Sequence, residues 1–377
     1  MDLGRTDEQS WISASIDSLL ARQWVAPQDA VSAPAGRREG VWAGLVSFGA
    51  LSVGGADGLG AAELCLIARA LGAHLASVPF LGSAGVRLAL APFAASLPPA
   101  MASLLSGRDA ISIALLEPGT GWATERPRTT LAAGSDAMVL HGEKAAVEQL
   151  ESARHIAVSA DLDGSAALVV IPVSAAGLTR RAQPCFDATL RMGQAGFEAV
   201  QVPGPAMITG EAAQDALGRL RTAGALLAAA DAIGAAARIF RLACDYAATR
   251  RQFGHVIASF QAVRHLLADA YVRQESAWSA ISYAAAALDA DSPETAQATS
   301  VAKAYAARSG QEIAHGAMQV FGGIAFTAEH PAHRFLRRVS VRAQQFGDAA
   351  HHEELLGRTL AGRAAVAQAR LAEGALA

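Results

Sequence analysis

The feature that most constrains the fold is a helical periodicity in the second half of the chain. From about residue 212 onward, apolar and alanine residues recur every three or four positions, as at Leu226 and Ile233. Similar stretches follow around residues 263–281, 293–319 and 349–373. Such spacing places the apolar side chains on one face of a helix. Four long amphipathic helices in succession predict an antiparallel bundle, whose alanine-rich faces also suit contact between subunits.

The residues before this region divide into a helical part and a β part. Near the N-terminus, Thr6 and Gln9 form a capping-box pattern. The predicted buried stripe after it comprises Trp11, Ile12, Ile16, Leu19 and Leu20. From about residue 110 to 205, short β-rich runs are bounded by Gly, Pro, Asp or Ser, which is typical of a small antiparallel barrel or sandwich. We predict a helical domain over residues 1–108, a β domain over 109–207 and a helical bundle over 208–377.

Composition excludes several classes of protein. With 52% hydrophobic and 17% charged residues, the chain is too apolar to be disordered. A net charge of −3 without a cluster of basic residues argues against nucleic acid as a partner. The three cysteines lie far apart, which argues against a disulfide framework or a metal site. The start of the chain lacks an apolar signal-peptide core, and Asp231 interrupts the most apolar run at 223–237. We therefore expect no membrane segment and a cytoplasmic location.

Two local motifs in the helical half point to chemistry. The first is Arg250-Arg-Gln-Phe-Gly254 followed by Gln261, at the junction of the first two predicted helices. The second is Gln319-Val-Phe-Gly-Gly-Ile-Ala-Phe-Thr327, followed by Glu-His-Pro. Guanidinium groups bind phosphates in a bidentate manner, and glycines let the backbone approach a ligand closely. On the residues alone, an exposed arginine pair and an ordinary helix C-cap remain the alternative interpretation.

The order and spacing of these motifs resemble the acyl-CoA dehydrogenase family. Leu116-Glu-Pro-Gly-Thr-Gly121 is similar to the family's Thr-Glu-Pro-x-x-Gly loop, and Val139-Leu-His-Gly-Glu-Lys144 is similar to its Leu-x-Gly-x-Lys turn. The resemblance extends over nearly the whole chain. It implies the family's α+β three-domain fold, with an N-terminal helical domain, a middle β-barrel and a C-terminal four-helix bundle. It also implies α,β-desaturation of an acyl-CoA thioester with FAD as the cofactor.

The resemblance assigns the cofactor-binding residues. In the family, the flavin ring lies against the β domain of one subunit, while the bundle of the neighbouring subunit holds the diphosphate and adenosine. The residues that match this second role are Arg250, Phe253, Gln261, Gln319, Gly322 and Gly323. Arg251 is a less certain member, because the family pattern has one arginine there.

The chain departs from the family at the positions that carry the chemistry. The family's catalytic base is a glutamate at one of two positions, which Phe346 and Gly224 occupy here, so no catalytic residue is assigned. Near the flavin ring, Leu116 replaces a threonine and Trp122 a serine. Glu148 would place a negative charge beside a flavin that becomes anionic on reduction. We therefore expect this β domain to hold a flavin ring poorly.

The leading hypothesis is a non-catalytic subunit of a heteromeric acyl-CoA dehydrogenase. A second family-like subunit would supply the base and the flavin-ring pocket, as in family members that break down steroids. An electron-transfer flavoprotein or a similar carrier would accept the electrons. One alternative is a homomeric enzyme with a relocated base, for which Asp348 and Glu353 are candidates. Another is a scaffold that binds neither flavin nor CoA.

Three polar clusters allow more than one interpretation. A row of arginines at helical spacing would contact CoA phosphates or a partner's acids, or else form a solvated helix face. Its members are Arg334, Arg337, Arg338 and Arg342. Asp231 and Arg238 suggest interface or capping groups, or groups that replace Gly224 in function from further along the helix. No second ligand set matches His351 and His352, so we assign no metal, and the acids around them suit the start of a helix.

Overall fold

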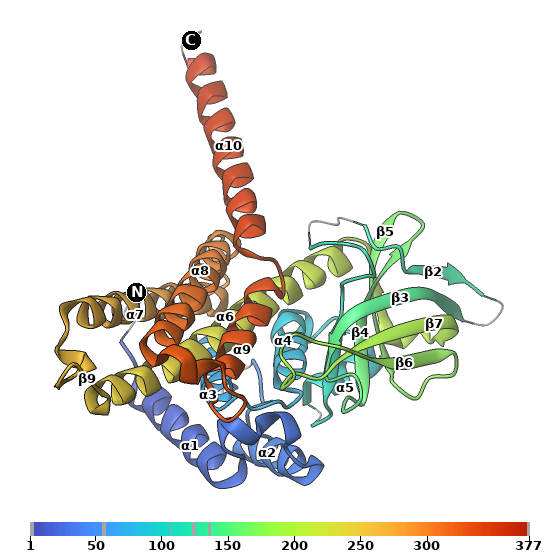
Figure 1. Cartoon of the computed structure of the whole chain (residues 1–377). Coiled ribbons are helices and arrows are strands. Elements are labelled where there is room, and N and C mark those ends of the chain that lie inside the picture. The colour runs from blue at the N-terminus through green and yellow to red at the C-terminus, as the bar shows by residue number, and fades with distance from the viewer. Residues whose placement is uncertain (1–3, 55–57, 107, 123–125, 135–136, 375–377) are drawn as a thin grey trace.

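The computed structural model describes residues 4–54, 58–106, 108–122, 126–134 and 137–374, and side chains as far as residue 363. Its N-terminal part is helical (Figure 1). The helices are α1 (Asp7–Gln23), α2 (Ala35–Phe48), α3 (Ala61–Ala73), α4 (Phe80–Leu90) and α5 (Pro99–Ser106).

The predicted start of α1 is confirmed. Thr6 Oγ1 accepts a hydrogen bond from the Gln9 amide at 3.1 Å, and the Gln9 side chain accepts one from the Thr6 amide at 3.3 Å. The aliphatic members of the stripe are buried. The inclusion of Trp11 in that stripe is wrong, because its side chain is 63% exposed. At 3.6 residues per turn, position 11 lies outside the face of the buried residues, and the ring stacks on Phe48 of α2.

The middle of the chain forms one mixed sheet. Its strands are β1 (Ile111–Ala114), β2 (Thr130–Ala133), β3 (Met138–Glu148), β4 (His155–Leu162), β5 (Ser165–Pro172), β6 (Leu178–Gln183), β7 (Met192–Val202) and β8 (Met207–Thr209). The order is β6-β7-β3-β2-β4-β5-β8, and β1 also pairs with β4. The expectation of antiparallel pairing throughout is wrong, because β4 runs parallel to β1 and β2. Parallel neighbours need a long connection, which the β2–β3 hairpin provides between β1 and β4.

The C-terminal part is a helical bundle, as predicted. It contains α6 (Gly210–Thr249), α7 (Gln261–Asp289), α8 (Thr295–Phe321), α9 (Ala332–Gln344) and α10 (Ala349–Gly374). The first three pack on one another, and α9 packs on both α6 and α8. The helix expected over 349–373 forms as α10, but α10 contacts α8 and then projects away from the body of the molecule (Figure 1). The fourth position of the packed set therefore belongs to the shorter α9.

Helix α6 is the centre of the structure. It packs on α3, α4, α8, α9 and β5, so it joins all three parts of the chain. Its crossing with α3 is close because both helices carry glycine there. A Cβ on Gly72 would lie 2.0 Å from the Asp231 carbonyl oxygen, and one on Gly234 would lie 1.9 Å from that of Arg69. Alanine and glycine on these faces thus allow backbones to approach.

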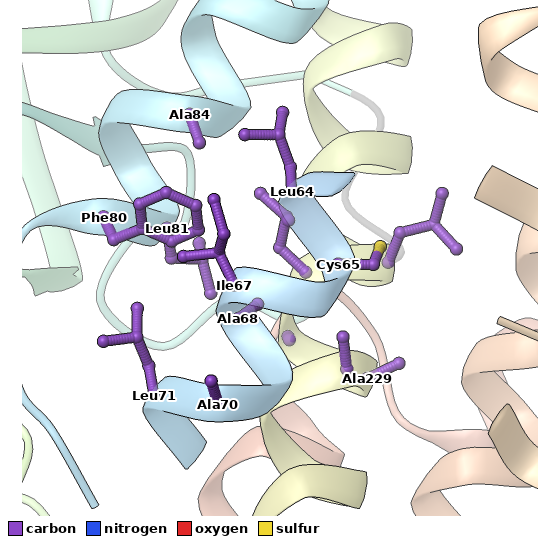
Figure 2. Close-up of a cluster of buried hydrophobic side chains, with 14 of the residues drawn as sticks. Leu64, Cys65, Ile67, Ala68, Ala70, Leu71, Phe80, Leu81, Ala84 and Ala229 are labelled. Carbon is purple, nitrogen blue, oxygen red and sulfur yellow. The ribbon is translucent and has the colours of Figure 1, made fainter. Parts of the chain in front are cut away.

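The core beside this crossing is apolar. Figure 2 shows Leu64 and Ile67 of α3 gathered with Phe80 and Leu81 of α4 and with Ala229 of α6. Among the helices that the structure describes, only α6 is long and apolar enough to cross a bilayer by length and composition. However, 83% of its most apolar window is buried inside the molecule, as in a core helix.

Candidate functional site

The first predicted motif lies at one end of the helical bundle. Helix α6 ends at Thr249, and a short hairpin of β9 (Arg251–Gln252) and β10 (His255–Val256) leads toward α7. Phe253 and Gly254 form its turn, with φ of +51° and +81°, and glycine suits the second of these. The Phe253 side chain is 88% exposed.

The second motif ends α8 beside the first. Gly322 has a φ of +67° and stops the helix, and a 3-10 turn over Gly322–Phe326 follows. The rings of Tyr246 in α6 and Phe321 in α8 lie 5.4 Å apart, so the ends of the two helices are neighbours. A Cβ on Gly322 or Gly323 would meet nothing within 4 Å, which leaves the surface open there. The structure therefore brings the two motifs to one end of the bundle.

This end of the bundle suits an anionic group. Arg250, Gln261 and Gln319 are exposed, and the Arg250 guanidinium makes no ion pair within the described residues. No side chain caps the start of α7 at Gln261, so its first backbone N–H groups stay available. Such a helix start carries partial positive charge and favours phosphates. The hairpin with β9 and the sheet lie on opposite sides of the molecule (Figure 1).

The two positions of the family's base are in contact with each other. A Cβ on Gly224 of α6 would lie 2.3 Å from Cε1 of Phe346, so the phenyl ring packs on the α6 backbone. Phe346 also stacks on Trp122, with ring centroids 5.1 Å apart. The Phe346 side chain is only 8% exposed. Neither Phe346 nor Gly224 can accept a proton.

Little space remains beside these rings. The cavity there has a volume of about 40 Å³, and its lining includes Leu116, Trp122, Glu148 and Phe346. Pockets for small molecules usually measure ~300–1,000 Å³. A flavin ring or an acyl chain therefore does not fit in this place.

The turn that carries Phe346 is fixed by its surroundings. Phe346 and Gly347 have φ of +57° and +100°, a conformation that costs energy for phenylalanine. His352 Nε2 donates to the Phe346 carbonyl at 3.0 Å, and its Nδ1 lies 3.2 Å from Ser300 Oγ. Burial lowers the pKa of His352 to about 4, so the imidazole is neutral near pH 7. A Cβ on Gly347 would lie 2.4 Å from Cδ2 of His351.

The chain's two lysines, Lys144 and Lys303, are both buried. Lys303 Nζ donates to the carbonyls of Arg342 and Ala343 at 3.0 and 2.9 Å, and so satisfies the last turn of α9. Burial lowers the pKa of Lys303 to about 7. Sequence reasoning missed the roles of Lys303 and His352, because no local motif marks a cap between distant helices. The rarity of lysine was the one available signal.

Glu117 and Lys144 connect the two family-like motifs of the β domain. Lys144 Nζ donates to Glu117 Oε1 at 2.8 Å, and the amides of Arg128 and Thr129 donate to the same carboxylate at 2.7 and 2.8 Å. Burial raises the pKa of Glu117, but hydrogen bonds from Lys144 and these amides outweigh it and leave the pKa below its usual value. Both motifs thus serve a contact inside the sheet domain.

Glu148 is not an uncompensated charge beside the flavin position. Arg342 of α9 donates to both of its carboxylate oxygens, at 2.5 and 3.0 Å. Arg342 also pairs with Asp231 at 3.1 Å, while Arg338 pairs with Asp187 at 2.6 Å and with Asp231 at 3.3 Å. These five residues form a buried ion network that joins the sheet domain to α6 and α9.

This network overturns the expectations for the arginine row and for Asp231. Arg338 and Arg342 are buried, so they neither form a solvated face nor reach a partner. Asp231 belongs to the same network and is neither an interface group nor a cap. The reason is tertiary: acids from β3, from α6 and from the loop before β7 converge on one face of α9, which periodicity cannot reveal.

The two candidate relocated bases are engaged in other contacts. Asp348 Oδ1 accepts the His351 amide at 2.8 Å at the start of α10. Glu353 is exposed and binds the Arg308 guanidinium at 2.8 and 2.7 Å. The hydrogen bond from Arg308 lowers the pKa of Glu353, which makes the carboxylate a weaker base. These contacts favour a polar helix start over a displaced base.

Comparisons with known proteins agree with this architecture. The family model described as "Acyl-CoA dehydrogenase, C-terminal domain" matches residues 212–361. Acyl-CoA dehydrogenase FadE27 of Mycobacterium tuberculosis is 27% identical over 96% of this chain and 99% of its own length. The ChsE4-ChsE5 complex from Mycobacterium tuberculosis contains a chain that is 25% identical, with a TM-score of 0.83 over 96% of this chain and 99% of that one. A variant of the Tcur3481-Tcur3483 steroid ACAD gives 27% identity and a TM-score of 0.82 over 97% of this chain and 100% of that one.

A central sheet between two helical regions is the architecture of the acyl-CoA dehydrogenase fold. Residues 212–361 match the acyl-CoA dehydrogenase family model, and the relatives that share the architecture over nearly the whole chain are acyl-CoA dehydrogenases, oxidoreductases that act on CH–CH bonds. The resemblance inferred from its motifs is therefore confirmed.

Proposed function

We propose that this chain is the non-catalytic subunit of a heteromeric acyl-CoA dehydrogenase, which desaturates an acyl-CoA thioester between its α and β carbons. The observation that carries the proposal is the contact between Phe346 and Gly224. A general base must come within hydrogen-bond reach of the proton that it removes. Neither residue can do so, and a partner subunit of the same family would supply the base.

The end of the bundle fits the nucleotide part of FAD. Arg250 and the uncapped start of α7 suit the diphosphate, and the exposed Phe253 ring offers an apolar surface. The remaining groups of this set would be the side chains of Gln261 and Gln319 and the open backbone at Gly322 and Gly323. When bound, FAD supplies the acceptor for the hydride. A protein of the same fold, glutaryl-CoA dehydrogenase from Mycobacterium smegmatis, was solved in complex with FADH2.

The chain's own sheet domain does not fit the flavin ring. Phe346 and Trp122 occupy the place beside α6, and the cavity left there is about 40 Å³. The nucleotide-binding end lies on the far side of the bundle from this domain (Figure 1). A nucleotide held at that end would therefore place its flavin ring in a neighbouring subunit.

Two relatives support a two-chain assembly and a bulky substrate. The ChsE4-ChsE5 complex pairs two chains, and the Tcur3481-Tcur3483 protein is described as a steroid ACAD. By analogy, we propose a steroid-derived acyl-CoA as the substrate and a second family member as the partner. An electron-transfer flavoprotein or a similar carrier would receive the electrons.

The test compares this chain alone with a complex co-expressed with a family-like chain encoded beside it. We expect the chain alone to lack flavin absorbance, and the complex to carry flavin that acyl-CoA reduces. Arg250→Gln should weaken flavin retention by the complex about tenfold or more, because it removes a charged hydrogen-bond donor. Arg180→Gln, an exposed control on β6, should leave retention unchanged. A flavin-loaded chain that turns over acyl-CoA without a partner would refute the proposal, and a flavin-free complex would favour a scaffold.

A further inference from the structure

A cavity of about 400 Å³ lies between α1, α3 and α6, apart from both parts of the site described above. Arginines are prominent in its lining: Arg5 before α1, Arg69 on α3, and Arg238 and Arg241 on α6. The proposed function gives none of them a role. Their concentration is unusual in a chain with a net charge of −3.

These guanidinium groups have no anionic partner of their own. None of the four forms an ion pair or a hydrogen bond with another residue in the part of the chain that the structure describes. Asp17 is the carboxylate among the lining residues, and it lies 3.5 Å from the His74 imidazole. Four positive charges therefore line one cavity whose lining contributes a single negative charge, while Glu275 of α7 acts on Arg69 from outside that lining.

The Arg69 side chain is held in position within this cavity by an aromatic ring. Its guanidinium carbon lies 4.4 Å from the centre of the Trp278 ring, and that of Arg5 lies 5.7 Å from the same ring. A cation above an aromatic face is held in a defined orientation. Burial and then the neighbouring Arg5 lower the pKa of Arg69 to about 10, so it stays charged near pH 7. The mutual repulsion of these cations is a cost that a bound anion would relieve.

We infer that this cavity binds a compact, multiply charged anion of the phosphate class, with a diphosphate group as the recognised chemistry. Guanidinium groups present several N–H donors in a planar fork and bind phosphate oxygens in a bidentate manner. The volume of about 400 Å³ falls within the range of ligand pockets, ~300–1,000 Å³, and exceeds what a single phosphate needs. Ser13 adds a hydroxyl to the same lining. An acidic segment of another protein fits less well, because Arg69 is too buried for a flat surface to reach.

The experiment titrates inorganic diphosphate, and separately ADP, into the full-length chain by calorimetry. Arg238→Gln/Arg241→Gln removes two exposed charges from the cavity. The matched control, Arg180→Gln/Arg181→Gln, removes two exposed charges from β6. We expect saturable one-to-one binding that the first variant weakens about tenfold or more and the control leaves unchanged. The Kd should rise with salt, because exposed charges are screened.

Three further results decide the outcome. Tighter binding of ADP than of inorganic diphosphate would identify a nucleotide as the source, and equal binding would identify free diphosphate. All titrations use an Arg250→Gln background, which removes the guanidinium proposed to bind diphosphate at the FAD-binding end, so that the cavity is measured apart from that end and from the fate of the proposed function. The inference is wrong if neither probe saturates, if both double variants lose binding equally, or if the cavity variant only weakens assembly with a partner chain.

Discussion

The His352 imidazole donates a hydrogen bond to the Phe346 carbonyl at 3.0 Å and so fixes the residue that fills the base position. Burial of the imidazole disfavours its protonated form and outweighs the bond to Phe346, which favours that form. Protonation of His352 would therefore destabilise the turn between α9 and α10. This turn carries Phe346, which stands where a self-sufficient enzyme would have its base.

Acid should destabilise the protein through His352. Its pKa is about 4 in the folded chain against 6.5 when exposed, so the unfolded chain binds the proton first as the pH falls. Stability is lost from about pH 6.5 down to about pH 4, by roughly 2 kcal/mol between pH 6.5 and 5. Urea unfolding should show a shallower pH slope over this window in His352→Asn than in wild type. The exposed His255→Asn should retain the wild-type slope, and an equal slope in all three would contradict the prediction.

Raising the pH above neutrality should stabilise the protein through Lys303. Its folded pKa is about 7, below the ordinary 10.5, so the unfolded chain retains the proton that the folded chain releases. Stability should rise by roughly 1 kcal/mol between pH 7 and 8. Lys144 contributes only above its own pKa of about 8. Lys303→Met should abolish the rise measured by urea unfolding, and a rise that persists in the variant would assign it to another group.

A side chain at Gly224 should be destabilising because of Phe346. Gly224→Ala places a Cβ about 2.3 Å from the phenyl ring and should cost ~1–3 kcal/mol by overpacking. In a Phe346→Ala background, the same change should cost little, and the double-mutant cycle measures the coupling. Gly218→Ala on the same helix meets nothing within 4 Å and should stabilise by ~0.5–1 kcal/mol. Additive costs at the two sites would show that the ring does not occupy this place in solution.

The buried ion network should be sensitive to loss of one member. Arg342→Met leaves Glu148 and Asp231 without their shared cation and should cost ~3–5 kcal/mol. Arg358→Met breaks an exposed pair with Glu354 and should cost ~0.5 kcal/mol or less. Denaturant midpoints at constant m-value would measure both. Equal small costs would mean that water reaches the network.

The sequence predicted the elements better than it predicted their partners. Periodicity located the helices around Leu226 and Ile281, and turn residues bounded the strands, because these are local signals. Contacts between distant segments carry no local signal. Arg338 and Arg342 read as a polar helix face, although acids from three other segments surround them. The exposed Trp11 failed for a local reason, because at 3.6 residues per turn it points well away from the mean direction of the buried positions of α1.

The candidate site, too, could be predicted from the sequence only in part. The motifs at Arg250 and Gln319 could be found from spacing and resemblance, and the structure brings their segments together. That neither position 224 nor position 346 carries an acid could also be read from the sequence. The packing of Phe346 on Gly224 could not be predicted from the sequence. It depends on a left-handed turn at Phe346 and on where that turn packs against α6.

The burial of both lysines also affects how this chain behaves beside reactive thioesters. Lysine amines at a protein surface are the usual targets of acylation, whereas guanidinium groups remain charged. With Lys144 and Lys303 enclosed, the chain presents no lysine side chain to a stray acyl donor or to an amine-directed cross-linker. In a mixed assembly, such reagents would label lysines of the other chain and leave this subunit's side chains unmarked.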